Sequence, residues 1–345
     1  MDPSFSATRG RVLRSPITAV LVALVLVTTG EWVVRTWVVS PHRSRAHPVY
    51  GMIRYPEARV VHSVEGYTRT RVNSLGLFDT DPEEWTLPRR AVLLGDSYAE
   101  AIQVSRAASF AGVTESLISG MEIINTGQSG RSPAHSVAYL EDFADLLHPD
   151  LIVLQVNDGD VEDLHRMSGD GTRPADASAL PENPAVAALK TLMDRSGLVT
   201  FLVRRMNELR AKETRRLSAK FSPRAPAGTP GPRTVPDDVE AKLDHLVERM
   251  RRVAPRVVVV YIPHVEYFEG TPRVSYPERR EFYRRFCAER DIVLVDPTQA
   301  FLDEYHRSRQ PAHGFANSTI GSGHINALGH HLVGTRLARV LDSHP

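Results

Sequence analysis

A serine, a histidine and an asparagine of the types needed for acyl transfer lie far apart in this sequence. Ser97 ends the tripeptide Gly95-Asp96-Ser97, directly after the short apolar run 91–94. A serine on a tight turn between a strand and a helix is held at the mouth of a sheet, where helix-start amides can stabilise an oxyanion. The tripeptide alone is weak evidence, because it should occur by chance in about one chain in ten of this length.

Two further polar groups follow the next two apolar runs, 121–124 and 151–156. Gly127 lies in the turn after the first, where a glycine can present its N–H without a side chain in the way. Asn157 follows the second, and its amide is another candidate donor. An oxyanion hole needs two or three donors aimed at one point, so we predict that Ser97, Gly127 and Asn157 form one. Individually, the two later residues also suit a turn glycine and a helix cap.

A nucleophilic serine needs a base, and His324 is the best placed of the 14 histidines. It follows a flexible Gly-Ser-Gly segment and precedes a helical apolar pattern over 327–341, so its ring can approach the carboxyl edge of a sheet. His330 and His331 lie inside that helix, and we interpret them as packing or surface residues. His264 is the reserve candidate.

Five short, nearly continuous apolar runs predict the strands that position these residues, as expected when both faces of a parallel sheet are covered. They are Ala91–Leu94, Met121–Ile124, Leu151–Val156, Arg256–Ile262 and Asp291–Val295. Helical patterns separate or follow them at 107–118, 135–148, 236–253 and 327–341. The alternation predicts right-handed βαβ units, and therefore an α/β fold: a three-layer α/β/α sandwich with a five-stranded parallel sheet. Sites in such folds lie at the carboxyl ends of the strands.

One segment breaks the alternation, an insertion at about 159–235. Its middle, 185–217, has a helical and arginine-rich pattern, and 221–235 is a loop rich in proline and glycine. We interpret the arginines as a solvated helix face, with contact to anionic lipid or glycan as the alternative.

The N-terminal segment predicts contact with a membrane. Residues 16–29 are uncharged and mostly apolar, but as a helix they extend only about 21 Å, so a full span must continue to Val39. We predict a cytoplasmic stub and signal-anchor helix in 1–40, a linker over 41–66 and an extracytoplasmic catalytic domain over 67–345. A cleaved signal peptide, which would release a secreted protein, is the alternative.

Composition excludes several other classes. A length of 345 residues with 42% hydrophobic and 24% charged residues suits one large or two small globular domains. The net charge of +1 gives no basis for a nucleic-acid partner. The single cysteine, Cys287, excludes an intramolecular disulfide framework and a cysteine-rich metal site, and its helical surroundings predict a buried apolar role. We predict no metal, nucleotide or other cofactor.

In these motifs the sequence resembles the SGNH, or GDSL-type, serine hydrolases. Four blocks in the family's order carry the resemblance: Gly95-Asp96-Ser97, Gly127, Asn157-Asp158 and His324. It covers about 67–341, and the segments 71–77 and 124–127 are similar to bacterial, membrane-anchored members. The resemblance implies Ser97 as nucleophile, His324 as general base, and the Ser97 N–H with the other two predicted donors as the oxyanion hole.

Two positions depart from the family pattern. The family normally has Asp three residues before the catalytic histidine, where this chain has Gly321, and Gln155 replaces the glycine of the third block. The acid matters because it sets the imidazole tautomer and stabilises the imidazolium. Three alternatives follow. A backbone carbonyl or Ser322 orients His324, a distant carboxylate such as Asp296 substitutes for the acid, or catalysis has been lost.

The sequence therefore predicts a membrane-anchored, extracytoplasmic serine esterase or acyl hydrolase. Asp96 and Asp158 are further candidate supporting residues. The resemblance implies an ester-bearing small molecule or an ester-modified envelope glycan as substrate. If a sugar hydroxyl replaces water, the same residues would make an O-acyltransferase acting on envelope polysaccharide. The other alternative is a non-catalytic binding module that retains the pocket.

Overall fold

The computed structural model describes residues 16–40, 44–167, 184–207, 210, 234–268 and 270–343. The chain divides into two compact units, Met1–His42 with Glu182–Arg224, and Arg43–Pro181 with Ala225–Pro345. We call the first the anchor unit and the second the hydrolase unit, after the roles that the sequence predicts for them. Part of the predicted insertion thus belongs to the same unit as the N-terminal apolar segment.

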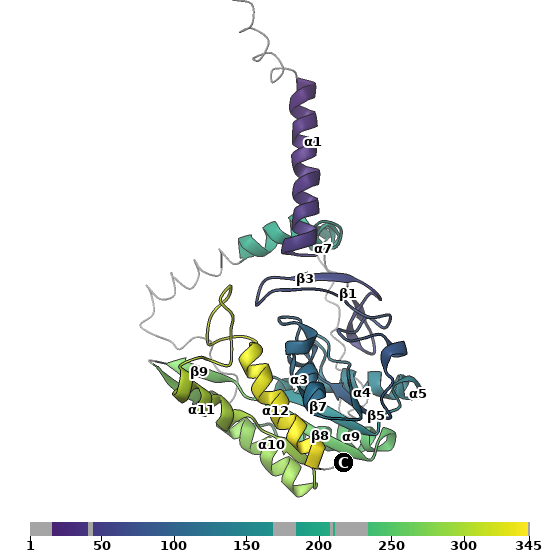
Figure 1. Cartoon of the computed structure of the whole chain (residues 1–345), viewed down its shortest axis with the longest axis vertical. Coiled ribbons are helices and arrows are strands. Elements are labelled where there is room, and N and C mark those ends of the chain that lie inside the picture. The colour runs from purple at the N-terminus through teal and green to yellow at the C-terminus, as the bar shows by residue number, and fades with distance from the viewer. Residues whose placement is uncertain are drawn as a thin grey trace, which may run out of the picture. The chain divides into compact units, whose positions relative to one another are not determined.

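Among its described residues, the anchor unit contains one helix long and apolar enough to cross a membrane by length and composition. Helix α1 (Pro16–Val33; Figure 1) continues as the π-helix η3 (Val34–Val38), giving 23 residues that include an 18-residue window with a mean hydropathy of 2.1. The helix therefore extends beyond the apolar run that ends at Thr29, as a span requires. The insertion contributes α7 (Pro184–Arg195), and residues 197–207 form a second helix.

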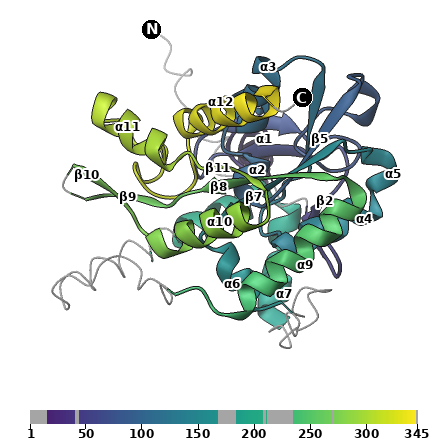
Figure 2. The same cartoon turned by 90° about the horizontal axis from the view of Figure 1, so that it is seen from below.

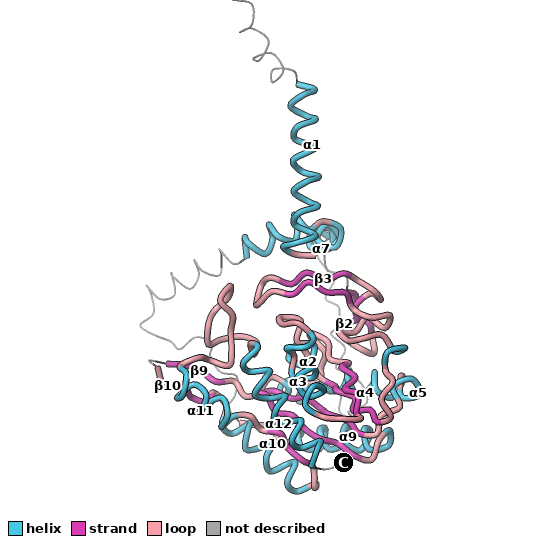
Figure 3. Tube along the Cα trace, in the orientation of Figure 1, coloured by secondary structure: helices cyan, strands magenta, loops and turns pink. Residues whose placement is uncertain are grey.

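The hydrolase unit is built on a five-stranded parallel sheet, in the order β11, β8, β7, β5, β6. Along the chain its strands are β5 (Arg89–Leu94), β6 (Met121–Asn125), β7 (Leu151–Asn157), β8 (Arg256–Ile262) and β11 (Val293–Val295). Each overlaps a run predicted from sequence. The predicted fold class is confirmed, and Figure 3 shows the strands enclosed by helices.

Alternate residues of each strand enter two separate cores, as expected for a sheet covered on both faces. Val92 and Leu94 pack toward α4, α9 and α10, whereas Ala91 and Leu93 pack toward α3, α11 and α12. Figure 2 shows α11 and α12 on one side of the strands and α9 and α10 on the other. These helices are α3 (Phe110–Leu117), α4 (Pro133–Asp142), α9 (Asp238–Val253), α10 (Pro277–Glu289), α11 (Thr298–Ser308) and α12 (Ala327–Ser343). Cys287 is buried in α10, as predicted.

Short elements complete the hydrolase unit. Three two-stranded antiparallel sheets are present: β1 (Ser44–His47) with β2 (Gly51–Arg54), β3 (Arg59–His62) with β4 (Thr68–Arg71), and β9 (Val265–Phe268) with β10 (Thr271–Val274). The short helices are η4 (Pro82–Glu84), α2 (Ser97–Glu100), η5 (Arg106–Ala108), α5 (Ala144–Leu147) and α6 (Asp160–His165). The segment predicted as a linker, 41–66, thus forms strands over much of its length.

Sequence patterns missed some boundaries. The predicted helix 135–148 is two helices, α4 and α5, separated at Phe143. The sequence pattern indicates a helix over only part of α10, around Cys287, and none at α11, because the many charged residues of these helices obscure the apolar repeat. Residues 168–183, 208–209 and 211–233 lie outside the described residues, and so does the predicted proline-rich loop except for its last two positions.

Candidate active site

The turn after β5 holds Ser97 at the carboxyl edge of the sheet. Ser97 is the first residue of α2, and the N-cap residue Asp96 accepts a hydrogen bond from the Tyr98 N–H at 2.9 Å. The Asp96 N–H in turn donates to Gln155 Oε1 at 3.0 Å. A Cβ at Gly95 would overlap this Gln155 oxygen. The unusual glutamine therefore fixes the nucleophile turn, and Gly95 makes room for it.

The predicted base reaches the predicted nucleophile. His324 Nε2 lies 2.7 Å from Ser97 Oγ, within hydrogen-bond distance, although the two residues are 227 positions apart. The Gly314 N–H donates to the His324 carbonyl at 2.8 Å. Asn326 Nδ2 donates to the carbonyls of Pro311 and Gly314. These hydrogen bonds fix the backbone of the segment that carries His324.

The other ring nitrogen of His324 contacts a carboxylate that the sequence did not reveal. His324 Nδ1 is hydrogen-bonded to Glu65 Oε2, and Glu65 lies in the turn between β3 and β4. A proton on Nδ1 bonded to this carboxylate leaves Nε2 to accept from the Ser97 hydroxyl. The predicted alternatives lie elsewhere: Asp296 pairs with Arg280 Nε at 2.7 Å, and the Ser322 N–H donates to the Thr319 carbonyl.

Glu65 is held in an ionised state. Burial by itself would raise the pKa of Glu65, but the hydrogen bond and the charge of His324 outweigh it, and the net pKa lies below the ordinary value of 4.5. The side chains of Glu65 and His324 are 20% and 28% exposed, so the pair borders solvent without being fully hydrated. An ionised carboxylate at this position can stabilise an imidazolium.

Two features allow Glu65 to approach the ring. A Cβ at Gly323, which has φ +88°, would overlap Glu65 Oε1, so only glycine leaves space for the carboxylate. Asn317 fastens the turn: its Oδ1 accepts from the Gly66 N–H at 2.9 Å, and its Nδ2 donates to the carbonyls of Ser63 (2.9 Å) and Gly66 (2.7 Å). Gly321 has φ +81°, so an Asp in the family's usual place would be strained here.

The predicted oxyanion donors reach the same edge, but not all of them are available. The Gly127 N–H donates to Asn125 Oδ1 at 2.9 Å, which differs from its predicted role. Gly127 instead allows close packing, because a Cβ there would lie 2.5 Å from Ala99 Cβ. Asn157 Nδ2 donates to Asp96 Oδ2 at 2.8 Å. An amide nitrogen carries two protons, so one remains for a ligand.

The other predicted supporting residues take structural roles. Asp158 accepts from the Tyr261 hydroxyl at 2.6 Å and from the His264 N–H at 3.1 Å, and burial raises its pKa to about 6. Asp96 caps α2 and binds Asn157, as described above, and burial raises its pKa as well. The reserve base His264 stacks edge-on with His313, their ring centroids 6.1 Å apart.

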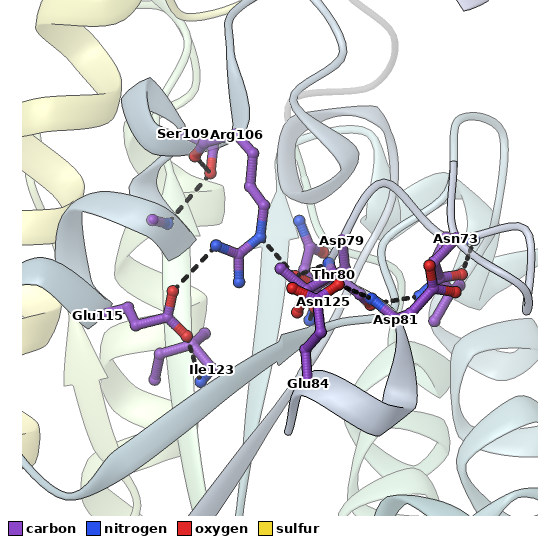
Figure 4. A network of polar contacts seen from close by, with 12 residues as sticks. Asn73, Asp79, Thr80, Asp81, Glu84, Arg106, Ser109, Glu115, Ile123 and Asn125 are labelled. Atoms are coloured by element: carbon purple, nitrogen blue, oxygen red, sulfur yellow. Dashed lines mark hydrogen bonds and ion pairs between the residues drawn. The ribbon is translucent and has the colours of Figure 1, made fainter. Parts of the chain in front are cut away.

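A buried network links the segment before β5 to the turn that contains Gly127 (Figure 4). Asp79 accepts from the Asn125 N–H at 2.7 Å and from Arg106 Nε at 2.6 Å, and burial raises its pKa to about 6 despite the Arg106 charge. Asn73 Nδ2 donates to the Thr80 carbonyl at 2.8 Å. The similarity at 71–77 therefore marks a loop that supports the second strand-end turn.

A second buried carboxylate, missed by sequence reasoning, supports the same region. Glu100, at the end of α2, pairs with Arg54 Nε at 2.6 Å and accepts from Gln128 Nε2 at 3.0 Å and from Ser129. Burial raises the pKa of Glu100, but Arg54 more than compensates and the net pKa is lowered. Its position three residues after Ser97 gave no signal that distinguished it from a surface residue.

The described residues contain no group of three or more His, Cys, Asp or Glu side chains arranged to hold a metal ion. A hydroxyl, an imidazole and a carboxylate in line, beside N–H donors at a helix start, suit nucleophilic attack on a carbonyl carbon.

No protein-family model and no curated protein matches the chain. It is similar to the solved structure of a G-D-S-L lipolytic protein from Veillonella parvula, at 13% identity over 73% of this chain and 97% of that one, with a TM-score of 0.40. It is also similar to the structure of the acetyl xylan esterase AlAXEase, at 13% identity over 73% of this chain and 99% of that one, with a TM-score of 0.42. A third similar structure is that of a variant of Axe2, an acetylxylan esterase from Geobacillus stearothermophilus. The identity is 14% over 73% of this chain and 94% of that one, and the TM-score is 0.40. The first of these structures is named as a member of the G-D-S-L family, which the motifs of this sequence also resemble.

Proposed function

We propose that this protein hydrolyses carboxylic esters, with Ser97 as nucleophile, His324 as general base and Glu65 as the acid that orients the base. The observation that carries the proposal is the continuous contact from Ser97 Oγ through both ring nitrogens of His324 to Glu65. A non-catalytic binding module has no need of this alignment. Gly321 leaves the family's usual position without an acid, and Glu65 would supply that acid from another part of the chain.

In the proposed reaction, Ser97 Oγ attacks the ester carbonyl as its proton passes to His324 Nε2. The tetrahedral oxyanion is stabilised by the Ser97 N–H, which opens α2 and has no carbonyl partner within that helix, and by the second Nδ2 proton of Asn157. Collapse breaks the ester C–O bond, and the leaving alcohol takes the proton from His324. Water then attacks the acyl-enzyme, with His324 again as base, and the carboxylic acid departs.

We further propose an acyl ester on a cell-envelope glycan, or a small ester, as the substrate, following the sequence resemblance. The apolar helix Pro16–Val38 would anchor the protein in the membrane, with the hydrolase unit on the extracytoplasmic side. Its length supports this assignment, since 23 residues extend about 35 Å, enough for a hydrocarbon core of about 30 Å.

Labelling with a fluorophosphonate, which reacts covalently with activated serines, tests the proposed function. We expect the full chain to be labelled, the label to map to Ser97, and labelling to disappear in Ser97→Ala. Glu65→Gln should slow the labelling rate, whereas Asp296→Asn should not. Absence of labelling of the folded wild-type protein at high probe concentration would instead favour a binding module.

A further inference from the structure

The anchor unit contains a pair of helices fastened to the end of its apolar helix. Ser196 Oγ donates to Glu31 Oε2 at 2.8 Å, and the N–H groups of Gly197 and Leu198 donate to the Glu31 carboxylate at 2.8 and 3.0 Å. Glu31 thus caps the helix formed by 197–207, although the two are far apart in the chain. A carboxylate at a helix N-terminus satisfies N–H groups that have no partner within the helix.

Close packing holds the second helix in place. A Cβ at Gly197 would lie 2.7 Å from Arg35 Cγ and 3.2 Å from the Val39 carbonyl oxygen, so the second helix packs closely against the end of the first. Thr200 and Val39 are buried in this contact region. Figure 1 shows the helices of residues 184–207 at the lower end of α1, running across its axis.

Helix α7 carries an apolar side that protein does not cover in the described part of the chain. Val186, Leu189 and Leu192 are 45%, 40% and 54% exposed. At about 100° per residue these positions fall within an arc of about 120°, and Thr191 lies on the opposite side. The helix 197–207 adds two further exposed apolar side chains one turn apart, Leu202 (57%) and Met206 (51%).

The helix pair is attached near the end of the apolar span. Glu31 lies 15 residues after Pro16, about 22 Å along the helix, and the apolar span ends at Val38. A hydrocarbon core of about 30 Å therefore ends within the last turns of the span, where the helix pair is attached. The exposed Trp32 and Trp37 lie at the same level, as interfacial tryptophans do.

We propose that the helices of residues 184–207 lie in the plane of the membrane interface, with Val186, Leu189 and Leu192 among the lipid chains. The partner is the bilayer surface itself. The inference rests on the proposed anchor role of Pro16–Val38. In-plane amphipathic helices bury their apolar side by about 5–10 Å at the headgroup boundary, which matches an apolar side fixed across the end of a span.

Fluorescence quenching in lipid nanodiscs tests this proposal on the full chain. In a Cys287→Ala background, the environment-sensitive dye NBD is attached to Leu189→Cys or to the matched control Thr191→Cys, on the opposite side of α7. A third label, at Val25→Cys, reports insertion of the anchor. Nanodiscs of phosphatidylcholine contain one copy of the protein, with lipid spin-labelled either at carbon 5 or at carbon 12.

We expect carbon-5 quencher to quench the dye at position 189 by about twofold or more relative to position 191. Quenching at Val25 by carbon-12 lipid, with equal weak quenching at 189 and 191, would overturn the interfacial proposal and leave the anchor intact. No quenching at Val25 would refute the anchor and this inference with it. Shielding at 189 that appears only in discs holding two copies would show that a second copy covers the surface, and would also overturn the proposal.

Discussion

The two sides of the candidate active site are held in different ways. Ser97 and Asn157 lie at the ends of β5 and β7, adjacent strands whose backbones are paired from Ala91 with Leu151 to Leu94 with Leu154. Glu65 lies in a turn of a separate two-stranded sheet and is fastened mainly by one side chain, that of Asn317. The position of Ser97, the proposed nucleophile, is thus a property of the sheet, whereas that of Glu65, the proposed acid, depends on contacts of a surface turn.

This difference accounts for the missing aspartate. A carboxylate that reaches the base from outside the sheet can be supplied by any nearby loop, provided that the space beside His324 is open. Gly323 leaves that space open. Gly321 stands where the family normally has Asp, and its φ of +81° disfavours any residue with a side chain. Loss of Ser97, at the edge of the parallel sheet, should therefore have a larger effect than substitutions at or near the β3–β4 turn that carries Glu65.

Removal of the nucleophile should have the largest effect. We expect Ser97→Ala to lower kcat/KM for ester hydrolysis by about 10⁴-fold or more, because no other hydroxyl occupies its position. Ser322→Ala is the matched control, since it removes a serine beside the base without touching the Glu65 contact, and its kinetics should remain close to those of the wild type. Equal losses in the two variants would contradict the proposed nucleophile.

Removal of the acid's charge should cost less. Glu65→Gln keeps the shape but loses the charge that orients and stabilises His324, so we expect kcat to fall by about 10²- to 10⁴-fold with KM little changed. Asp296→Asn should retain nearly full kcat. The reverse pattern would show that Asp296 supplies the acid.

The same pair predicts a dependence of stability on pH. Because the pKa of Glu65 is lower in the folded protein than its ordinary value of 4.5, its contribution is present above pH 4.5 and is lost as pH falls through the folded-state pKa. Denaturant unfolding of the wild type should therefore lose stability below pH 4.5 more steeply than Glu65→Gln. Parallel curves would indicate that no such contact exists in solution.

Closing the space beside the acid should have an intermediate effect. Gly323→Ala places a methyl group on Glu65 Oε1, and we expect a fall in kcat of about 10- to 100-fold. The control is Gly120→Ala, which has a similar φ of +71° but nothing within 4 Å of the added carbon, so it isolates backbone strain. Both variants should be compared by ester kinetics and by thermal unfolding. A similar loss of kcat in both would make strain, rather than displacement of Glu65, the cause.

Loosening the turn should have the smallest effect. Asn317→Ala removes three hydrogen bonds from the turn that carries Glu65, and we expect kcat to fall by about fivefold while KM and Tm change little. In the Glu65→Gln background the same substitution should have almost no further effect on kcat. An undiminished fivefold loss there would show that Asn317 acts independently of the acid.

Much of the part of the site that the parallel sheet positions could be predicted from the sequence. Strand β8 coincides with its predicted bounds, and Ser97 and His324 meet as expected. Local spacing was enough to place Ser97, because a serine directly after a buried parallel strand must lie at the carboxyl edge of the sheet. The Gly127 N–H was predicted less well, since no pattern indicates that the Asn125 side chain two residues earlier takes it.

The sequence by itself predicted the five-stranded sheet, the approach of His324 to Ser97 and an apolar helix near the N-terminus, because each follows from a local pattern of residue types. Only the tertiary structure revealed Glu65 as the partner of His324 and Glu31 as the cap of the helix 197–207. Those contacts join residues 259 and 166 positions apart. Neither depends on a repeat or spacing along the chain, and each forms only after separate elements have packed together.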